Sequence, residues 1–416
     1  MTTELDGIGS LDLARYIRPG DLVVWGQGCA EPLSLTDALA GQRDQLGGVR
    51  CFTGVSRSAA VRAENCDYLS FTSYTAAGAN RALADAGVLD ILPVHYSELP
   101  RILGNGPLRA DVLFLSLPPA GPDGTFGLGL GADYPATLIG SARTVIAEIN
   151  DQVPDVGGDR RVHSGEIDVL VRVSHAPPEY PLAPARGIED AIAGHIAGLI
   201  PDGATIQLGI GSIPSAVASR LRGHRDLGVH SGVITDAVAD LIAAGVVTGA
   251  RKSLDPGIVV TGFLMGSRAL ISLAAASPSI ELRDTRYTHD PAVLAAQRRL
   301  VAINSATEVD LTGQVNSETA ASRYVGAVGG AADFLRSAAR SDGGVPVIAL
   351  PSTAGPASRI VARLSGPTTL ARADAGVIVT EYGVADLRGL TLSQRRERML
   401  AIAQPDHRAA LEKENP

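Results

Sequence analysis

Short apolar, β-branched runs alternate with Ala/Leu-rich stretches of helical period along most of this chain. Such alternation is typical of α/β layers, in which helices connect the strands of mostly parallel sheets. At 416 residues, the chain is too long for one ordinary domain and suits two. We therefore expect an α/β fold with two domains. The runs expected as strands are 112–117, 145–150, 168–173, 205–209, 300–304, 345–350 and 375–381, and the stretches expected as helices are 37–45, 188–200, 215–222, 236–244 and 391–402.

The proline-dense segment 177–184 (PPEYPLAP) is the expected linker, which divides the chain into domains 1–176 and 185–416. Residues 19–39 and 201–221 share one plan: a Pro/Gly/Asp turn, an apolar strand, a G-x-G turn, a proline and a helix. This internal echo indicates that the two domains are related. It favours an active site in the cleft between them.

Composition excludes several classes of function. Lys plus Arg number 36 and Asp plus Glu 44, a net charge of −8 that gives no general attraction to nucleic acid or anionic membranes. The apolar runs are too short to span a bilayer, and the first residues lack the pattern of a signal peptide. Three cysteines form no disulfide framework, and the eight histidines show no metal-ligand spacing. We expect a cytoplasmic protein without a metal site.

Two glycine turns enter helices and are candidates for anion binding. Glycines let the backbone turn sharply, and the free N–H groups at a helix start can hold a phosphate or a developing oxyanion. The alternative is that each is only a tight strand-to-helix connection. The candidate residues are Gly209, Ile210, Gly211, Ser212 and Ile213 in the first turn and Gly329 and Gly330 in the second.

Three polar residues are candidates for catalysis. His230 ends an expected strand at the edge where ligands of open α/β sheets bind, although a histidine there is often a structural hydrogen-bonding partner. Glu308 shares a face with Asp310 if 306–312 is extended, so the pair could divide acid and base roles or form a solvated edge. Glu31 precedes a helix start, where the helix dipole alone would favour a carboxylate.

Both halves of the chain carry a set of distinctive motifs: GQGCAEP (26–32), SLPPAGPDGTFGLG (116–129), VIAEINDQVP (145–154), QLGIGSIPSAV (207–217), FLMGS (263–267), INSATEVDLTGQVNSE (303–318), VGGAADF (328–334), PSTA (351–354) and TEYGVADLRG (380–389). Together these motifs resemble the acetyl-CoA hydrolase/transferase family, a group of class I CoA-transferase relatives. The resemblance implies two α/β domains facing each other and an acyl-CoA substrate, with coenzyme A as a substrate moiety rather than a tightly bound cofactor. It also implies a homodimer.

The chain departs from the family pattern where the chemistry takes place. The family's transferases use a glutamate that becomes linked to coenzyme A, and the resemblance puts Gly232 of GVHSGV at that position. A family lysine that helps to hold CoA is replaced by Gly355. His289 has a matching asparagine in much of the family, and the sequence does not assign its effect.

Three hypotheses follow. Hydrolysis of an acyl-CoA thioester or CoA-linked carbonyl compound needs only water as nucleophile, which His230, Glu308 or Glu31 could position, so we favour it. The alternative is an acyl-CoA:carboxylate CoA-transferase that uses another carboxylate, such as Glu308. The second alternative is a non-catalytic homologue that binds acyl-CoA.

Overall fold

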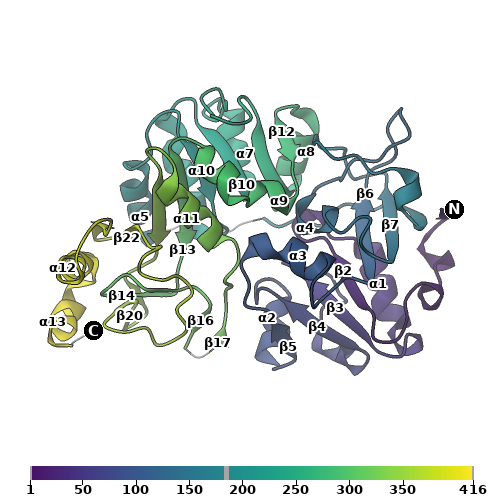
Figure 1. Ribbon diagram of the computed structural model, residues 1–416, viewed down its shortest axis with the longest axis horizontal. Coiled ribbons are helices and arrows are strands. Elements are labelled where there is room, and N and C mark those ends of the chain that lie inside the picture. Colours follow the sequence, from purple (N-terminus) through teal and green to yellow (C-terminus); the bar gives the residue numbers. More distant parts are fainter. Residues whose placement is uncertain (1, 182–186, 322, 415–416) are drawn as a thin grey trace. The chain divides into compact units, whose positions relative to one another are not determined.

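The computed structural model describes residues 2–181, 187–321 and 323–414 (Figure 1). It divides into two compact units: unit 1 comprises Met1–Pro181 and Val260–Thr288, and unit 2 comprises Leu182–Val259 and His289–Pro416. This division differs from the expected domains 1–176 and 185–416, because the segment 260–288 returns to unit 1. Of the expected linker 177–184, residues 182–184 lie outside the described residues.

Unit 1 is built on a parallel sheet with strand order β1-β8-β7-β6-β2-β3-β4-β5. Every pairing in this sheet is parallel. Large apolar side chains, Trp25, Phe71 and Phe114 among them, pack in its core. The strands are β1 Thr3–Leu5, β2 Leu22–Trp25, β3 Val49–Thr53, β4 Leu69–Ser73, β5 Leu89–Ile91, β6 Val112–Leu117, β7 Thr144–Asn150 and β8 Val169–Val173, and the helices are α1 Leu33–Gln42, α2 Asn80–Asp85, α3 Leu99–Gly104 and α4 Asp133–Ala136.

Backbone hydrogen bonds explain why 260–288 belongs to unit 1. The amide of Ala132 donates to Gly262, that of Leu282 to Gly157 at 2.7 Å, and that of Tyr180 to Gly266 at 2.7 Å. The sequence pattern does not predict that 260–288 belongs to unit 1, because hydrogen bonds between distant backbone groups do not depend on local composition. The elements of the returning segment are β11 Val259–Leu264, whose first residue lies in unit 2, α8 Arg268–Ala276, β12 Ile280–Leu282 and α9 Thr285–Thr288.

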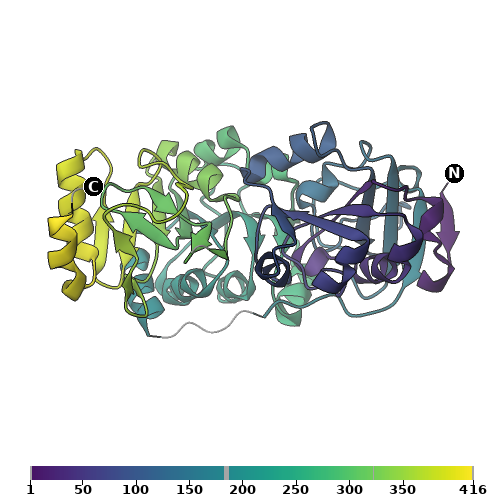
Figure 2. The ribbon, with the colours of Figure 1, turned by 90° about the horizontal axis from the view of Figure 1, so that it is seen from below.

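Unit 2 contains the strand order β10-β9-β13-β18-β22-β23, in which only the β22–β23 pairing is antiparallel. Figure 2 shows the strands between the teal helices α5 to α7 and the green helices α10 and α11. The strands of the main sheet are β9 Thr205–Leu208, β10 Gly228–Ile234, β13 Leu300–Ser305, β18 Val345–Ala349, β22 Val377–Thr380 and β23 Gly383–Asp386. The helices are α5 Ile188–Ala197, α6 Ser212–Arg220, α7 Asp236–Ala243, α10 Pro291–Ala296, α11 Ala331–Arg340, α12 Leu392–Ile402 and α13 Pro405–Lys413.

Smaller sheets complete unit 2. Strands β15, β14 and β21 form a three-stranded sheet, and β16–β17 and β19–β20 form two hairpins. Their bounds are β14 Glu308–Asp310, β15 Val315–Asn316, β16 Thr319–Ala320, β17 Arg323–Tyr324, β19 Thr353–Ala354, β20 Ala357–Ser358 and β21 Ile360–Val361.

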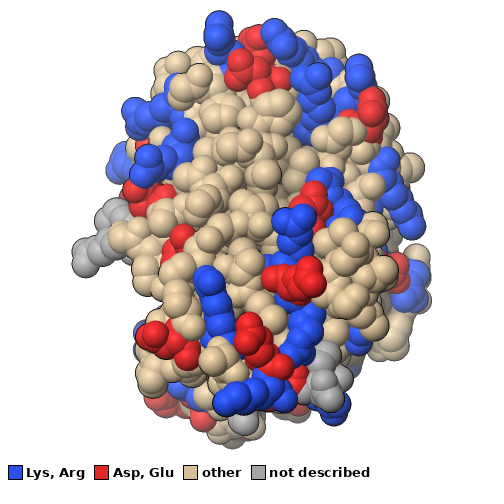
Figure 3. Space-filling view, turned by 90° about the vertical axis from the view of Figure 1, so that its left-hand side faces the viewer, with Lys and Arg blue, Asp and Glu red and all other residues tan. Residues whose placement is uncertain are grey.

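The α/β class with mostly parallel sheets is confirmed, and each expected strand and helix corresponds to one in the structure. The expected strand 112–117 matches β6 at both ends, and the others differ at one end or both. No helix among the described residues is both long and apolar enough to cross a bilayer. On the face in Figure 3, basic and acidic side chains lie interspersed around an uncharged area. Ion pairs such as Arg336–Asp374 (2.8 Å) and Arg388–Asp386 (2.7 Å) in unit 2 show the same mixing.

Candidate active site

The carboxyl ends of β10, β9 and β13 lie side by side, because these three neighbouring strands run parallel. The Ser231 hydroxyl donates to the carbonyl of Leu208 at 3.5 Å, so Gly232 on β10 lies beside the glycine turn that follows β9. On the other side of that turn, a β-carbon at Gly209 would lie 3.3 Å from the Asn304 side chain of β13. Ligands of open α/β sheets bind at such edges.

The turn 209–213 has the backbone geometry for which glycine is suited. Gly211 has a φ of +133° and immediately precedes α6. Ile210 and Ser212 are exposed while Ile213 is buried, so the turn is accessible before the helix enters the core. The first amides of α6 can therefore reach an anion from solvent.

Gly232 faces a buried imidazole. A β-carbon placed on Gly232 would lie 2.6 Å from Cε1 and 3.0 Å from Nε2 of His289. The ring of His289 is also packed edge-on against Phe334 of α11, with ring centroids 4.8 Å apart. Burial is the main cause that lowers the pKa of His289 from its ordinary value to about 3, and the nearby His230 lowers it further. His289 is therefore neutral at neutral pH.

His230 shares a face of β10 with Gly232, since side chains two residues apart on a strand point the same way. It is fully buried, and its Nδ1 lies 3.4 Å from Nε2 of Gln297 at the end of α10. The 289–297 segment thus covers this face of β10. The arrangement brings together His230, Gly232 and His289, the last of which had no assigned role in the sequence.

The second glycine turn, at Gly329 and Gly330, immediately precedes α11, and this helix contacts His289. Gly329 has a φ of +55°, and Gly330 caps the start of α11. Phe334, whose amide donates to the carbonyl of Gly330, is the residue that packs on His289. Phe334, in the first turn of α11, therefore packs against the same imidazole that faces Gly232.

Glu308 is buried on β14 and already accepts several hydrogen bonds. Its Oε1 accepts from Asn316 Nδ2 at 3.0 Å, from the Ser365 amide at 2.9 Å and from the Gly366 amide at 3.1 Å. The Ser365 hydroxyl lies 2.9 Å from its Oε2. These bonds tie β14 to the 365–366 loop, which is a structural arrangement.

The expected pairing of Glu308 with Asp310 as acid and base finds no support in the geometry. Asp310 accepts from the amide and hydroxyl of Thr312 at 2.9 and 2.7 Å and from the Gln314 side chain at 2.7 Å. Its carboxylate therefore stabilises the turn that follows β14. The extended segment ends at Asp310, so Thr312 does not continue the strand face.

Glu31 belongs to unit 1, where it is 1% exposed. Its carboxylate accepts from the Ser56 hydroxyl, the Arg57 amide at 2.9 Å, Trp25 Nε1 at 3.3 Å and the Tyr180 hydroxyl at 3.3 Å. Burial outweighs these bonds and raises the pKa of Glu31 to about 6. A carboxyl group with this pKa can exchange a proton near neutral pH.

The sequence did not single out Asp133, a second buried carboxyl of unit 1. Its oxygens accept from Gln27 Nε2 at 2.6 Å, the Tyr96 hydroxyl at 2.6 Å and the Thr285 hydroxyl at 3.0 Å. Burial raises the pKa of Asp133 to about 6. Its φ of +45° sets Asp133 apart from most residues with a side chain, but that angle is visible only in the structure.

Gly355 occupies the turn between β19 and β20, and a β-carbon there would meet no atom within 4 Å. Space therefore does not explain the absence of a lysine at this position, whereas the φ of +58° is one that residues with a side chain rarely adopt. No group of three or more His, Cys, Asp or Glu side chains that could hold a metal ion occurs in the described part of the chain.

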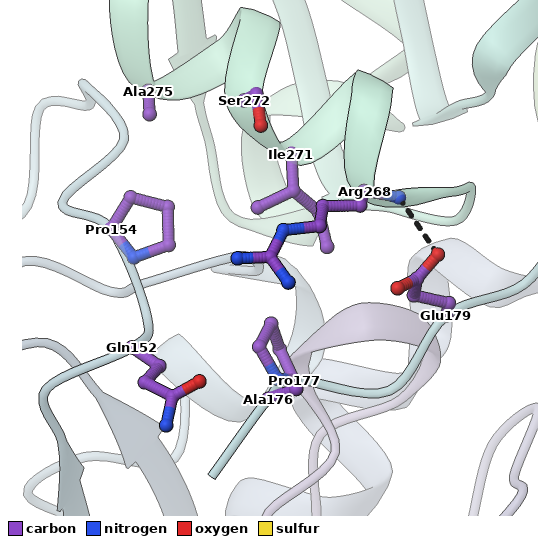
Figure 4. Close-up of a pocket in the computed structure, with 9 residues that line it drawn as sticks. All are labelled: Gln152, Pro154, Ala176, Pro177, Glu179, Arg268, Ile271, Ser272 and Ala275. Atoms are coloured by element: carbon purple, nitrogen blue, oxygen red, sulfur yellow. Dashed lines mark hydrogen bonds between the residues drawn. The ribbon is translucent and has the colours of Figure 1, made fainter. Parts of the chain in front are cut away.

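A pocket of about 260 Å³ lies in unit 1, at the start of α8 (Figure 4). The carboxylate of Glu179 accepts from the backbone amide of Arg268 at 2.9 Å, while the Arg268 guanidinium extends over Pro177. One cation and one anion line this pocket, so it has no charge excess that would attract an anionic ligand. None of the expected site residues lines it. Its lining residues are Gln152, Pro154, Ala176, Pro177, Glu179, Arg268, Ile271, Ser272 and Ala275.

Profiles of two domains match the chain. The acetyl-CoA hydrolase/transferase N-terminal domain matches residues 8–179, and the acetyl-CoA hydrolase/transferase C-terminal domain matches residues 266–415. The 4-hydroxybutyrate coenzyme A transferase of Clostridium kluyveri is 35% identical over 395 residues, covering 94% of this chain and 92% of its own. The chain belongs to the acetyl-CoA hydrolase/transferase family, whose enzymes act on acyl-CoA thioesters.

Solved structures agree with this assignment. RipA from Yersinia pestis superposes with a TM-score of 0.91 at 34% identity, over 96% of this chain and 94% of that one. A 4-hydroxybutyrate CoA-transferase from Porphyromonas gingivalis superposes with a TM-score of 0.84 at 33% identity, over 99% of this chain and 96% of that one. The family resemblance stated from the motifs is thus confirmed, and the family includes both hydrolysis and transfer.

Proposed function

We propose that this enzyme hydrolyses an acyl-CoA thioester with water as the direct nucleophile. The observation that carries the proposal is Gly232 near the carboxyl end of β10, which has no side chain at the position where the family resemblance puts the carboxylate of the transferases. In the proposed reaction the water oxygen bonds to the thioester carbonyl carbon and the carbon–sulfur bond breaks. The water loses a proton and the CoA sulfur gains one, so the products are a free acid and CoA thiol.

The glycine turns supply the proposed binding groups. Amides at Gly329 and Gly330 are proposed to stabilise the oxyanion of the tetrahedral intermediate, and one such donor is typically worth about 3 kcal/mol. The turn 209–213, with its accessible amides before α6, is proposed to hold a phosphate of CoA. CoA binding would then depend on backbone groups at a site without the lysine that Gly355 replaces.

Transfer through another carboxylate is the second candidate, and geometry weakens it. Glu308 would have to give up its bonds to Asn316 and to the 365–366 loop before attacking a thioester. Its carboxylate would also have to reach the thioester carbon at about 3 Å. His230 and Glu31 remain proposed as groups that position or deprotonate water, and acyl-CoA binding without catalysis remains the third candidate.

The decisive assay is a single turnover in ¹⁸O-labelled water with acetyl-, butyryl- or 4-hydroxybutyryl-CoA, with and without an acceptor acid. Direct attack predicts CoA release without an acceptor, ¹⁸O in the product acid and no labelled protein carboxylate. Borohydride and hydroxylamine should trap no enzyme–CoA thioester.

Two other results would replace the proposal. Acceptor-dependent exchange with a trapped glutamyl-CoA would establish transfer. CoA binding, measured by calorimetry, without release in either assay would establish a binding role. Sedimentation analysis of the same sample tests the homodimer, which we also propose from the family resemblance.

A further inference from the structure

The side-chain position of Gly232 is filled by another residue. The β-carbon position of Gly232 lies 2.6 Å from Cε1 and 3.0 Å from Nε2 of His289. Real β-carbons essentially never approach a neighbouring atom below 3.0 Å. Any side chain at position 232 thus requires the imidazole to move, and a glutamate requires still more of the same space.

Moving the imidazole of His289 would cost free energy, because the ring is buried and closely packed. His289 is 3% exposed, and Phe334 packs against its ring at 4.8 Å between centroids. Interiors are close-packed, so a shifted ring would displace its neighbours as well. The positions 232 and 289 are therefore sterically coupled although they are far apart in the sequence.

The ring presents polar atoms to this place. Its Cε1–Nε2 edge is nearest to Gly232, whereas Nδ1 lies 3.8 Å away. Gly232 itself is partly exposed, so the space beside it is open to a substrate at the carboxyl edge of the sheet. Burial keeps the imidazole neutral, so no positive charge on His289 would attract a carboxylate to this place.

We propose that Gly232 and His289 form a matched pair that sets the nucleophile of this enzyme. The imidazole fills the space that a carboxylate side chain would need at position 232, which leaves the attack on the thioester to water. This inference rests on the proposed hydrolytic function for its catalytic half, whereas its steric half is independent of the reaction.

The test is a double-mutant cycle over Gly232→Glu, His289→Asn and the double variant, with melting temperature, CoA affinity and both activities measured for each. Gly232→Glu alone should melt several degrees lower than the wild type and gain no exchange, because the glutamate collides with the imidazole. His289→Asn alone should keep its CoA affinity and gain no exchange, because it adds no carboxylate at position 232.

The double variant should be more stable than Gly232→Glu alone, because the smaller asparagine makes room for the new side chain. It should also gain acceptor-dependent exchange and a trapped glutamyl-CoA. A parallel cycle with Gly232→Ala, which adds only the colliding β-carbon, answers the steric question if the glutamate variants fail to fold. Gly223→Ala is the matched control, since a β-carbon there meets nothing within 4 Å.

Additive melting losses in both cycles would overturn the pairing, as would acceptor-dependent exchange by Gly232→Glu alone. These outcomes are distinguishable from failure of the proposed function. If the wild type releases no CoA in water, hydrolysis is wrong, and the melting temperatures still decide whether the two positions are coupled.

Discussion

Glu31 and His289 show how burial acts on groups of opposite charge type. Burial raises the pKa of Glu31 to about 6 and lowers that of His289 to about 3, so both residues move toward their uncharged forms. The sequence shows a glutamate at 31 and a histidine at 289, but it carries no information about how deeply either side chain is buried. The reactivity of each is therefore a property of the folded chain.

The pKa of His289 predicts a pH dependence of stability. Between about pH 3 and 6.5 the unfolded chain binds a proton at His289 that the folded chain does not, so lowering the pH favours unfolding. The charge that acts on the ring is that of His230, and the neighbouring Asp290 is occupied in bonds to the amides of Ala292 and Val293. Relative to His289→Asn, the wild type should lose about 2 kcal/mol of stability between pH 8 and pH 5.

Urea unfolding of both proteins at the two pH values measures this difference. Equal losses in both proteins would mean that His289 binds its proton in the folded state as readily as in the unfolded state. His407→Asn, a change at a partly exposed histidine of α13, provides the matched control.

At the scale of elements, the sequence located the helices and strands better than their ends. The helix expected at 215–222 is α6 Ser212–Arg220, because Pro214 is tolerated in a first helical turn. The strand expected to end at His230 continues as β10 to Ile234, so Gly232 lies within a strand rather than after it. These ends depend on capping and sheet pairing, which a propensity pattern does not encode.

Glu308 provides an element-scale prediction. Its bonds join β14 to Asn316 and to the 365–366 loop, so Glu308→Gln should cost about 1–3 kcal/mol, because a neutral amide oxygen accepts these buried bonds more weakly than a carboxylate does. Hydrolysis should persist in the folded fraction. Chemical unfolding and initial rates measure the two effects, with the exposed Glu397→Gln in α12 as control.

A stable Glu308→Gln protein that has lost CoA release would contradict this structural role. It would return Glu308 to the position of a catalytic carboxylate. The element-scale experiment therefore also discriminates between the first two candidate functions.

For the whole molecule, the main difference from expectation is that the chain returns to unit 1. Residues 260–288 contribute hydrogen bonds from Thr285 to Asp133 and from the Tyr180 amide to Gly266. A polypeptide that ends at residue 181 would leave these polar groups without those partners. The segment 1–181 is consequently an incomplete folding unit.

We predict that residues 1–181 expressed alone will show no cooperative thermal transition. The same residues joined to 260–288 through a flexible linker of roughly 15 residues should regain one, because the missing backbone and side-chain bonds are restored. Circular dichroism on heating compares the two. An equally cooperative transition for 1–181 alone would show that the returning segment is dispensable for folding.

The order of apolar runs and glycine turns was sufficient to determine the α/β class and the family. Residue identity alone showed that Gly232 has no side chain. Both kinds of information are local properties of the sequence. Tertiary structure alone decided that 260–288 belongs to unit 1, that Glu308 clamps a loop and that His289 fills the space beside Gly232. Each of these depends on groups distant in the sequence that meet only when the chain is packed, since close packing and burial are properties of neighbours in space.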